Sequence, residues 1–122
     1  MGSHPINLAV RFLLELIALL VVGAWGWRQT DSWLKFVLAL GIPLLLAIVW
    51  GTFAVPDDPS RSGAAPVAVP GILRLLIELV IFGLAVWALY DMGYTSFSWT
   101  LAIIVALHYI ASYDRIRWLL AQ

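Results

Sequence analysis

The chain contains no cysteine, and only 11% of its 122 residues are charged. The lack of cysteine excludes a disulfide framework, a cysteine-ligated cluster and a thiol nucleophile. Seven basic and seven acidic residues give a net charge of zero, so the basic surface typical of nucleic-acid binding is missing. The sequence also has no glycine-rich phosphate loop and no closely spaced His-x-x-x-His pattern. We therefore expect no nucleic-acid partner, no metal and no cofactor.

Hydrophobic residues, in contrast, make up 63% of the chain, where a soluble domain has roughly 45–50%. A soluble fold of this length could not bury so much apolar surface. Four segments reach the length of about 20 residues that a membrane-spanning helix needs. They are residues 6–27, 33–53, 70–90 and 97–116.

The connections between these segments predict how the helices are arranged. Two are short, whereas residues 54–69 form a long polar loop that is rich in proline and aspartate. Short connections place consecutive helices antiparallel. We therefore expect an all-α fold, an up-down four-helix bundle that spans the membrane as a single domain over residues 1–122.

The basic residues predict the orientation of the chain in the membrane. Lys and Arg are enriched on the cytoplasmic side of membrane proteins. Two basic residues, Arg28 and Lys35, lie on one side of the expected bundle. The other side carries Arg11, Arg61, Arg74, Arg115 and Arg117. This excess places both termini in the cytoplasm.

An internal repeat carries the charges that lie within the expected spans. Arg11 and Glu15 in the first span match Arg74 and Glu78 in the third, each in the pattern Arg-x-x-x-Glu-Leu. The match suggests two related helical hairpins that run parallel through the membrane. An ionisable residue at the centre of a span costs about 2.5–3.5 kcal/mol. Because both motifs are expected at the same depth, we expect their charges to pair across the helices.

Two further residues should reach the same layer from the other spans. His108 lies about eight residues before the cytoplasmic end of the fourth span. Glu15 and Glu78 lie at a similar distance from the cytoplasmic starts of the first and third spans, so we expect all three residues at the same depth. Trp50 brings an indole donor near the end of the second span, which Pro43 should kink. Small residues at spacing four should allow close helix packing. These pairs are Ala47 with Gly51 and Ala102 with Ala106.

The candidate ligand or proton site is therefore made of polar residues from all four spans. They are Arg11, Glu15, Trp50, Arg74, Glu78 and His108. The first interpretation is a non-enzymatic protein whose buried Arg/Glu layer supports assembly with itself or with a partner in the bilayer. One alternative is a small proton- or ion-coupled transporter that uses Glu15 and Glu78. Another is a lipid- or anion-binding protein that uses Arg11 and Arg74. No Ser, His and Asp converge by simple spacing, so we do not expect an enzyme.

Several stretches of the chain resemble a known family. They are residues 7–16 followed by Gly23-Ala24-Trp25-Gly26, residues 43–56, and residues 74–83 followed by Ala88-Leu89-Tyr90. Together these stretches are similar to the YrdB-like family of small bacterial membrane proteins, over about the first three quarters of the chain. The resemblance implies a four-helix protein of the bacterial cytoplasmic (inner) membrane, and it implies no activity. The family pattern includes the two Arg-x-x-x-Glu motifs and Trp50, but not His108.

Overall fold

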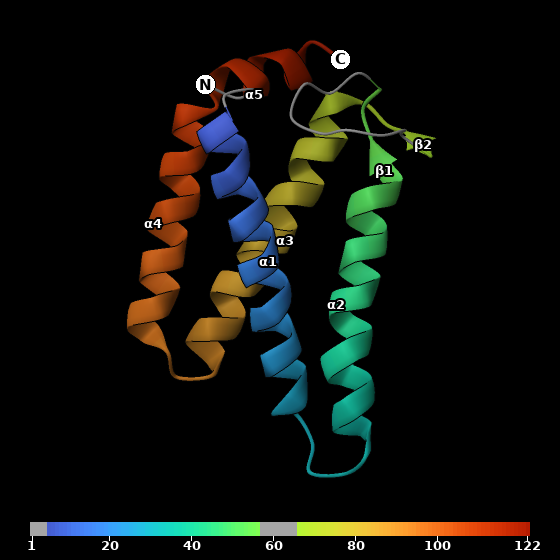
Figure 1. The fold of residues 1–122 in the computed structure, drawn as a ribbon, viewed down its shortest axis with the longest axis vertical. Helices are drawn as coiled ribbons and strands as arrows, with labels where there is room; N and C mark the ends of the chain where they lie inside the picture. The colour runs from blue at the N-terminus through green and yellow to red at the C-terminus, as the bar shows by residue number, and fades with distance from the viewer. Residues whose placement is uncertain (1–4, 57–65) are drawn as a thin grey trace.

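A computed structural model describes residues 5–56 and 66–122, and these residues form an all-α fold with one short strand pair (Figure 1). The helices are α1 (Pro5–Trp27), α2 (Leu34–Thr52), α3 (Gly71–Asp91), α4 (Thr95–Ala111) and α5 (Tyr113–Leu120). The strands are β1 (Phe53–Ala54) and β2 (Val67–Ala68), which pair in parallel. The first three helices begin and end within one residue of the segments expected from the sequence.

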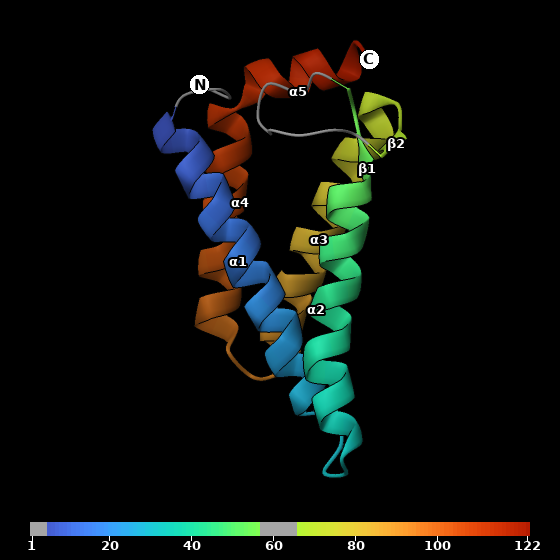
Figure 2. The same cartoon turned by 45° about the vertical axis from the view of Figure 1, so that its right-hand side comes forward.

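Helices α1 and α3 begin at the same end of the molecule, where α2 also ends (Figure 1). We call it the α5 end, because α5 lies across it (Figure 2). The strand pair lies at this end as well, and the Val69 amide donates to the Ala54 carbonyl at 3.0 Å. It joins the two sides of the expected 54–69 loop, of which residues 57–65 lie outside the described part of the chain.

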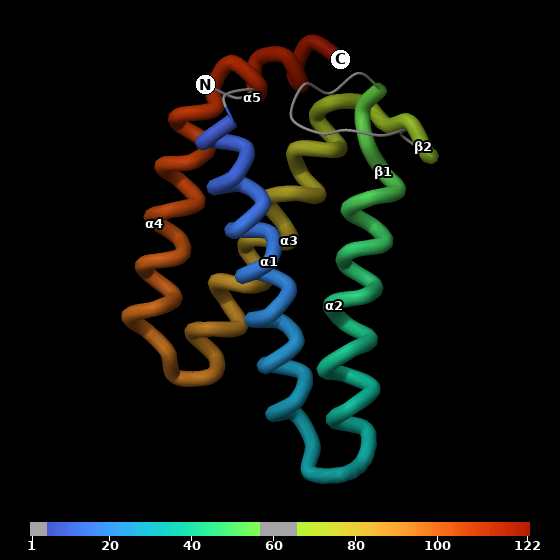
Figure 3. The backbone as a smooth tube through the Cα atoms, viewed as in Figure 1, coloured from blue at the N-terminus to red at the C-terminus, as the bar shows by residue number. Residues whose placement is uncertain are grey.

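The fourth expected segment is broken, so its predicted end at residue 116 is wrong. Helix α4 stops at Ala111, and α5 leaves Ser112 at an angle of 70° (Figure 3). The physical reason lies in the composition after the bend, where three charged residues follow within five positions. A straight helix would carry them past the packed part of the molecule, whereas the bend turns one of them, Arg115, inward to a buried position.

The core lies between α1, α3 and α4. Each helix buries a stripe of residues three or four positions apart, as expected for one face of a helix. The stripes include Leu14, Ala18 and Val22 of α1, Ile81, Phe82 and Ala85 of α3, and Leu101, Val105 and Tyr109 of α4. The Phe82 ring packs edge-on against Trp50 of α2 at 5.4 Å and against Tyr109 at 6.1 Å between ring centres.

Helix α2 is the least covered helix, since Trp50 is its only buried residue. It packs on α1 through glycines that the sequence analysis did not select. A Cβ atom on Gly26 would lie 2.8 Å from the Leu38 carbonyl oxygen, and one on Gly23 would lie 3.0 Å from that of Ala39. Small residues matter where two backbones meet, and the backbones meet here rather than at Gly51, where a Cβ would contact nothing.

Pro43 lies inside one continuous helix, and the one sharply bent helix pair in the described residues is α4 with α5. Pro43 therefore does not interrupt α2, and the expected kink stays a prediction. The Ala39 carbonyl, which loses its helical donor to Pro43, faces Gly23 of α1. Close packing of α1 thus covers the carbonyl that the proline leaves without a helical partner.

By length and composition, α1, α2 and α3 could each cross a membrane. Helices α4 and α5 add a fourth span if the bent pair is counted as one. Many large apolar side chains of the described helices are exposed, among them Leu20, Leu40 and Ile110, each about 70% exposed. Such faces suit hydrocarbon rather than water.

Candidate functional site

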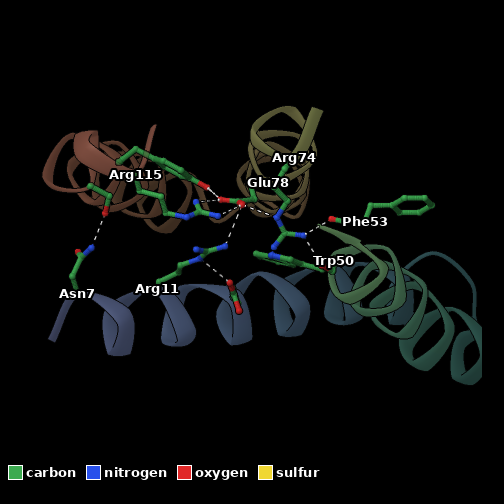
Figure 4. A network of polar contacts seen from close by, with 10 residues as sticks. Asn7, Arg11, Trp50, Phe53, Arg74, Glu78 and Arg115 are labelled. Atoms are coloured by element: carbon green, nitrogen blue, oxygen red, sulfur yellow. Dashed lines mark hydrogen bonds and ion pairs between the residues drawn. The ribbon is translucent and has the colours of Figure 1, made fainter. Parts of the chain in front are cut away.

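The centre of the polar cluster is Glu78 of α3, whose side chain is fully buried. Its carboxylate accepts hydrogen bonds from four described side chains. They are Arg74 Nε at 2.8 Å, Arg11 Nη2 at 3.1 Å, Tyr109 Oη at 2.8 Å, and Arg115 Nη1 and Nη2 at 2.9 and 2.8 Å. Figure 4 shows these groups converging on the carboxylate from α1, α3 and the α4–α5 region. Both oxygens are satisfied, as a buried carboxylate requires.

Arg74 connects this carboxylate to the end of α2. Its Nη1 donates to the backbone carbonyl of Trp50 and, at 2.9 Å, to that of Phe53. The last carbonyls of a helix have no partner within the helix and carry a partial negative charge. The Arg74 guanidinium therefore caps the C-terminal end of α2 from α3. These hydrogen bonds fix that end of α2, although few of the helix's side chains are buried.

Arg11 of α1, the counterpart of Arg74 in the repeat, lies between two carboxylates. Its Nε donates to Glu15 at 3.1 Å, and its Nη2 reaches Glu78. The Arg11 side chain is 7% exposed and that of Glu15 is 26% exposed. The two repeats thus meet through Arg11, while Glu15 stays at the edge of the cluster.

Helix α5 is fixed to the same cluster by a salt bridge and by close backbone packing. Arg115 forms the two-pronged pair with Glu78, a geometry that favours arginine over lysine. Gly71, at the start of α3, lies directly under the Leu119 backbone, and a Cβ there would collide with it. Asn7 Nδ2 donates to Ser112 Oγ at 2.6 Å and joins α1 to the bend.

A cavity of about 330 Å³ opens beside the cluster between α1, α2 and α3. We call it the polar cavity. Its lining residues are Leu8, Arg11, Phe12, Glu15, Leu19, Ala47, Trp50, Gly51 and Arg74. The Trp50 indole nitrogen is buried and has no hydrogen-bond partner among the described residues, and the ring lies beside the Arg74 guanidinium (Figure 4). Two arginines, one glutamate and the Trp50 side chain thus line one space, and the indole N–H lies buried in its wall.

A second cavity, of about 410 Å³, lies further along the same pair of helices. We call it the apolar groove, because no charged side chain lines it. Its lining residues are Leu16, Leu19, Leu20, Gly23, Ala24, Trp27, Ala39, Leu40 and Pro43. Leu19 therefore borders both cavities.

Five of the six residues selected from the sequence lie at the cluster or its cavity, and His108 does not join them by a hydrogen bond among the described residues. Its ring is buried and packs edge-on against Tyr109 at 5.5 Å. Within residues 5–56 and 66–122, the His108 Nδ1 has no hydrogen-bond partner. The described residues also contain no group of three His, Asp or Glu that could hold a metal ion.

The sequence analysis did not select two of the side chains that donate hydrogen bonds to the Glu78 carboxylate, Tyr109 and Arg115. A straight fourth helix would place Arg115 outside the layer, and only the bend at Ser112 returns it to Glu78. One signal was present, because residues 115–120 read Arg-Ile-Arg-Trp-Leu-Leu. Such a mixture of charged and apolar residues is typical of a helix lying along a boundary rather than crossing it.

The fold and its charges define a small helical protein with three helices, or four counting the bent pair, that are long and apolar enough for a membrane. Residues 9–106 match the family described as "Protein of unknown function (DUF2568)". The chain belongs to this family.

One sequence relative is the "Uncharacterized protein YrdB" of Bacillus subtilis (strain 168). It is 47% identical over 116 residues, which cover 95% of this chain and 94% of the relative. The resemblance to the YrdB-like family is therefore confirmed, and it extends beyond the three quarters of the chain first assigned to it. No solved structure matches the chain.

Proposed function

We propose that the protein is a non-enzymatic membrane protein that binds an anionic group in the polar cavity. The observation that carries this proposal is that Arg11 and Arg74 line one cavity together with Trp50, whose buried indole N–H has no partner among the described residues. Guanidinium groups bind phosphate and carboxylate oxygens in fixed geometry. A buried donor without a partner is costly, and an anion would satisfy it.

The surrounding contacts support this proposal because they hold the arginines in place. Arg74 is fixed by Glu78 and by the end of α2, and Arg11 is fixed by Glu15 and Glu78. Groups that are already positioned lose little freedom when a ligand binds. The same contacts weigh against Glu78 as a proton carrier, since its carboxylate is fully buried under four side chains. Glu15, which borders the cavity, is the better candidate for the transport alternative.

We further propose that four segments span the bacterial cytoplasmic membrane, with the α5 end facing the cytoplasm. The chain lacks cysteine, so single cysteines report the topology directly. Ser96 lies in the first turn of α4, at the end opposite α5, and Gln122 follows α5. A membrane-impermeant thiol reagent should label Ser96→Cys in intact cells, and Gln122→Cys only after the cells are opened. The reverse pattern would contradict the orientation.

Assembly with a second copy or with another membrane protein, the first interpretation from the sequence, stays a prediction. The exposed faces of α2 are large enough to take part in it. Crosslinking in membranes through single cysteines on α2 would test it independently of anion binding.

Anion binding is tested with inorganic phosphate on the protein purified in a neutral detergent. At constant ionic strength, replacing chloride by phosphate should raise the unfolding temperature, because a ligand of the folded state stabilises it. Trp50→Phe keeps an aromatic ring and removes the N–H. A hydrogen bond to a charged group contributes about 1.5–3 kcal/mol, so the apparent affinity should fall about tenfold or more.

Trp99→Phe is the matched control, since Trp99 is 64% exposed on α4 and lies outside the polar cavity. It should keep the full response to phosphate. If the wild type shows no phosphate-dependent shift, or if Trp50→Phe and Trp99→Phe respond alike, the proposed anion site is wrong.

A further inference from the structure

The polar cavity and the apolar groove lie end to end along α1 and α2. Leu19 of α1 lines both. On α2 the border is made by Ala47 and Gly51 beside the polar cavity, and by Ala39 and Pro43 beside the apolar groove. These four residues are spaced by four, which places them on one face of the helix. Charged groups thus lie at one end of a shared path, and only apolar side chains at the other.

The dimensions of this path suit part of a lipid. Each cavity lies within the range of about 300–1,000 Å³ that is usual for small-molecule sites. From Leu19 to Trp27 the groove follows eight residues of α1, or about 12 Å. One leaflet of a bilayer provides about 15 Å of hydrocarbon, half of the whole core. A single acyl chain can therefore lie along the groove while its head group stays beside the arginines.

The polar cavity also restricts the head group. Arg11, Arg74 and the Trp50 N–H favour a negative charge, whereas the Glu15 carboxylate repels a second one. A carboxylate accepts hydrogen bonds from hydroxyl groups. The lining therefore suits a phosphate diester with one charge and a neighbouring hydroxyl better than a phosphate monoester with two charges.

We propose that the ligand of the polar cavity is an anionic phospholipid, bound with its phosphate diester beside Arg11 and Arg74 and one acyl chain in the apolar groove. This inference rests on the proposed anion site and adds the identity of the ligand. It explains why a polar cavity and an apolar groove share Leu19 and one face of α2. The ligand reaches the site sideways from the bilayer, along the surface of α1 and the poorly covered α2, without separating the two helices.

The test measures lipid retention by native mass spectrometry of the protein in a neutral detergent. The protein is offered equal amounts of phosphatidylglycerol and phosphatidylcholine with the same acyl chains. We expect phosphatidylglycerol to be retained at least tenfold better. Glycerophosphoglycerol, which keeps the phosphate diester of phosphatidylglycerol and has no acyl chain, should need at least a hundredfold higher concentration to displace it.

Two variants test separately the part of the site that would bind the phosphate and the part that would bind the acyl chain. Trp50→Phe should reduce the preference for phosphatidylglycerol at least fivefold, because it removes a donor to the phosphate. Ala24→Trp fills the apolar groove from an exposed position and should reduce retention of the lipid at least fivefold. Ala106→Trp is its control, since Ala106 is an exposed alanine on α4 outside both cavities.

The outcomes separate the two proposals. If the two lipids are retained equally and inorganic phosphate does not raise the unfolding temperature, both the proposed anion site and the proposed lipid ligand are wrong. If inorganic phosphate stabilises the protein and glycerophosphoglycerol competes as well as the intact lipid, the anion site stands and the lipid proposal is wrong. The competition needs no variant, so it decides the matter even if Ala24→Trp does not fold.

Discussion

The two Arg-x-x-x-Glu motifs are nearly identical in sequence, yet their glutamates have different surroundings. Glu78 is fully buried and accepts bonds from three arginines and a tyrosine among the described residues. Glu15 is 26% exposed, and it forms an ion pair with the arginine of its own motif, Arg11. Both arginines, in contrast, are buried and both reach Glu78.

The difference follows from the position of each helix rather than from the motif. Helix α3 lies between α1 and α4, and α5 packs on its first turn, so Glu78 faces groups from several elements. On α1, Glu15 faces the cavity beside α2, which is poorly covered. One copy of a repeat can thus become the structural centre while the other stays accessible to a ligand.

The largest effect should come from removing the charge at the centre. Glu78→Gln keeps the shape of the side chain but leaves three buried guanidinium groups without their shared carboxylate. Breaking a buried ion pair from one side costs about 3–5 kcal/mol. We expect a loss of that size in the free energy of unfolding, measured by circular dichroism in mixed micelles. A loss below about 1 kcal/mol would show that Glu78 is not the centre.

The next effect concerns α5, in which Arg115 forms an ion pair with Glu78 of the second repeat. Gly71→Ala places a methyl group against the Leu119 backbone. Overpacking of this kind costs about 1–3 kcal/mol, and it should also expose α5 to proteases. Gly41→Ala is the control, because a Cβ there contacts nothing, and alanine favours a helix by up to about 1 kcal/mol. Equal stability of both variants would refute the docking of α5.

Tyr109→Phe tests the surroundings of Glu78 without changing any charge, because it removes only the neutral hydroxyl that donates to the Glu78 carboxylate. The hydroxyl donates to Glu78 at 2.8 Å. Its removal should lower the free energy of unfolding by about 1–2 kcal/mol, within the range for a buried acceptor that loses a partner. Tyr113→Phe, an exposed tyrosine in α5, should change it far less in the same assay.

The smallest effect is expected at the other copy of the motif. Glu15→Gln removes one of the two carboxylates that Arg11 contacts and leaves Arg11 paired with Glu78. Because the Glu15 side chain is 26% exposed, the loss should be about 1 kcal/mol or less. Stability should therefore change little, while the response to phosphate changes because the carboxylate borders the cavity. If Glu15→Gln and Glu78→Gln destabilise the protein equally, the two motifs are equivalent and the comparison fails.

The sequence predicted those features that depend on local composition. The apolar runs located α1, α2 and α3 within one residue, and the repeated motif located Arg11 and Glu78 at the same layer. The bend at Ser112 could not be predicted in this way, because it depends on Arg115 reaching Glu78 on another helix. The contacts of Gly23 and Gly26 were missed for the same reason, as only the crossing of α1 and α2 makes their small size important.

The bend also has a consequence for the order of biosynthesis. Arg115 follows Glu78 by 37 residues, and a ribosome adds about 5–20 residues per second. For roughly 2–7 s, by that rate, the glutamate has its own Arg74 and the earlier Arg11 but not the third guanidinium. The pairs that Glu78 forms with Arg74 and Arg11 can therefore form before the last partner is made. Completion of the cluster is then set by the late helix α5 rather than by the long apolar helices.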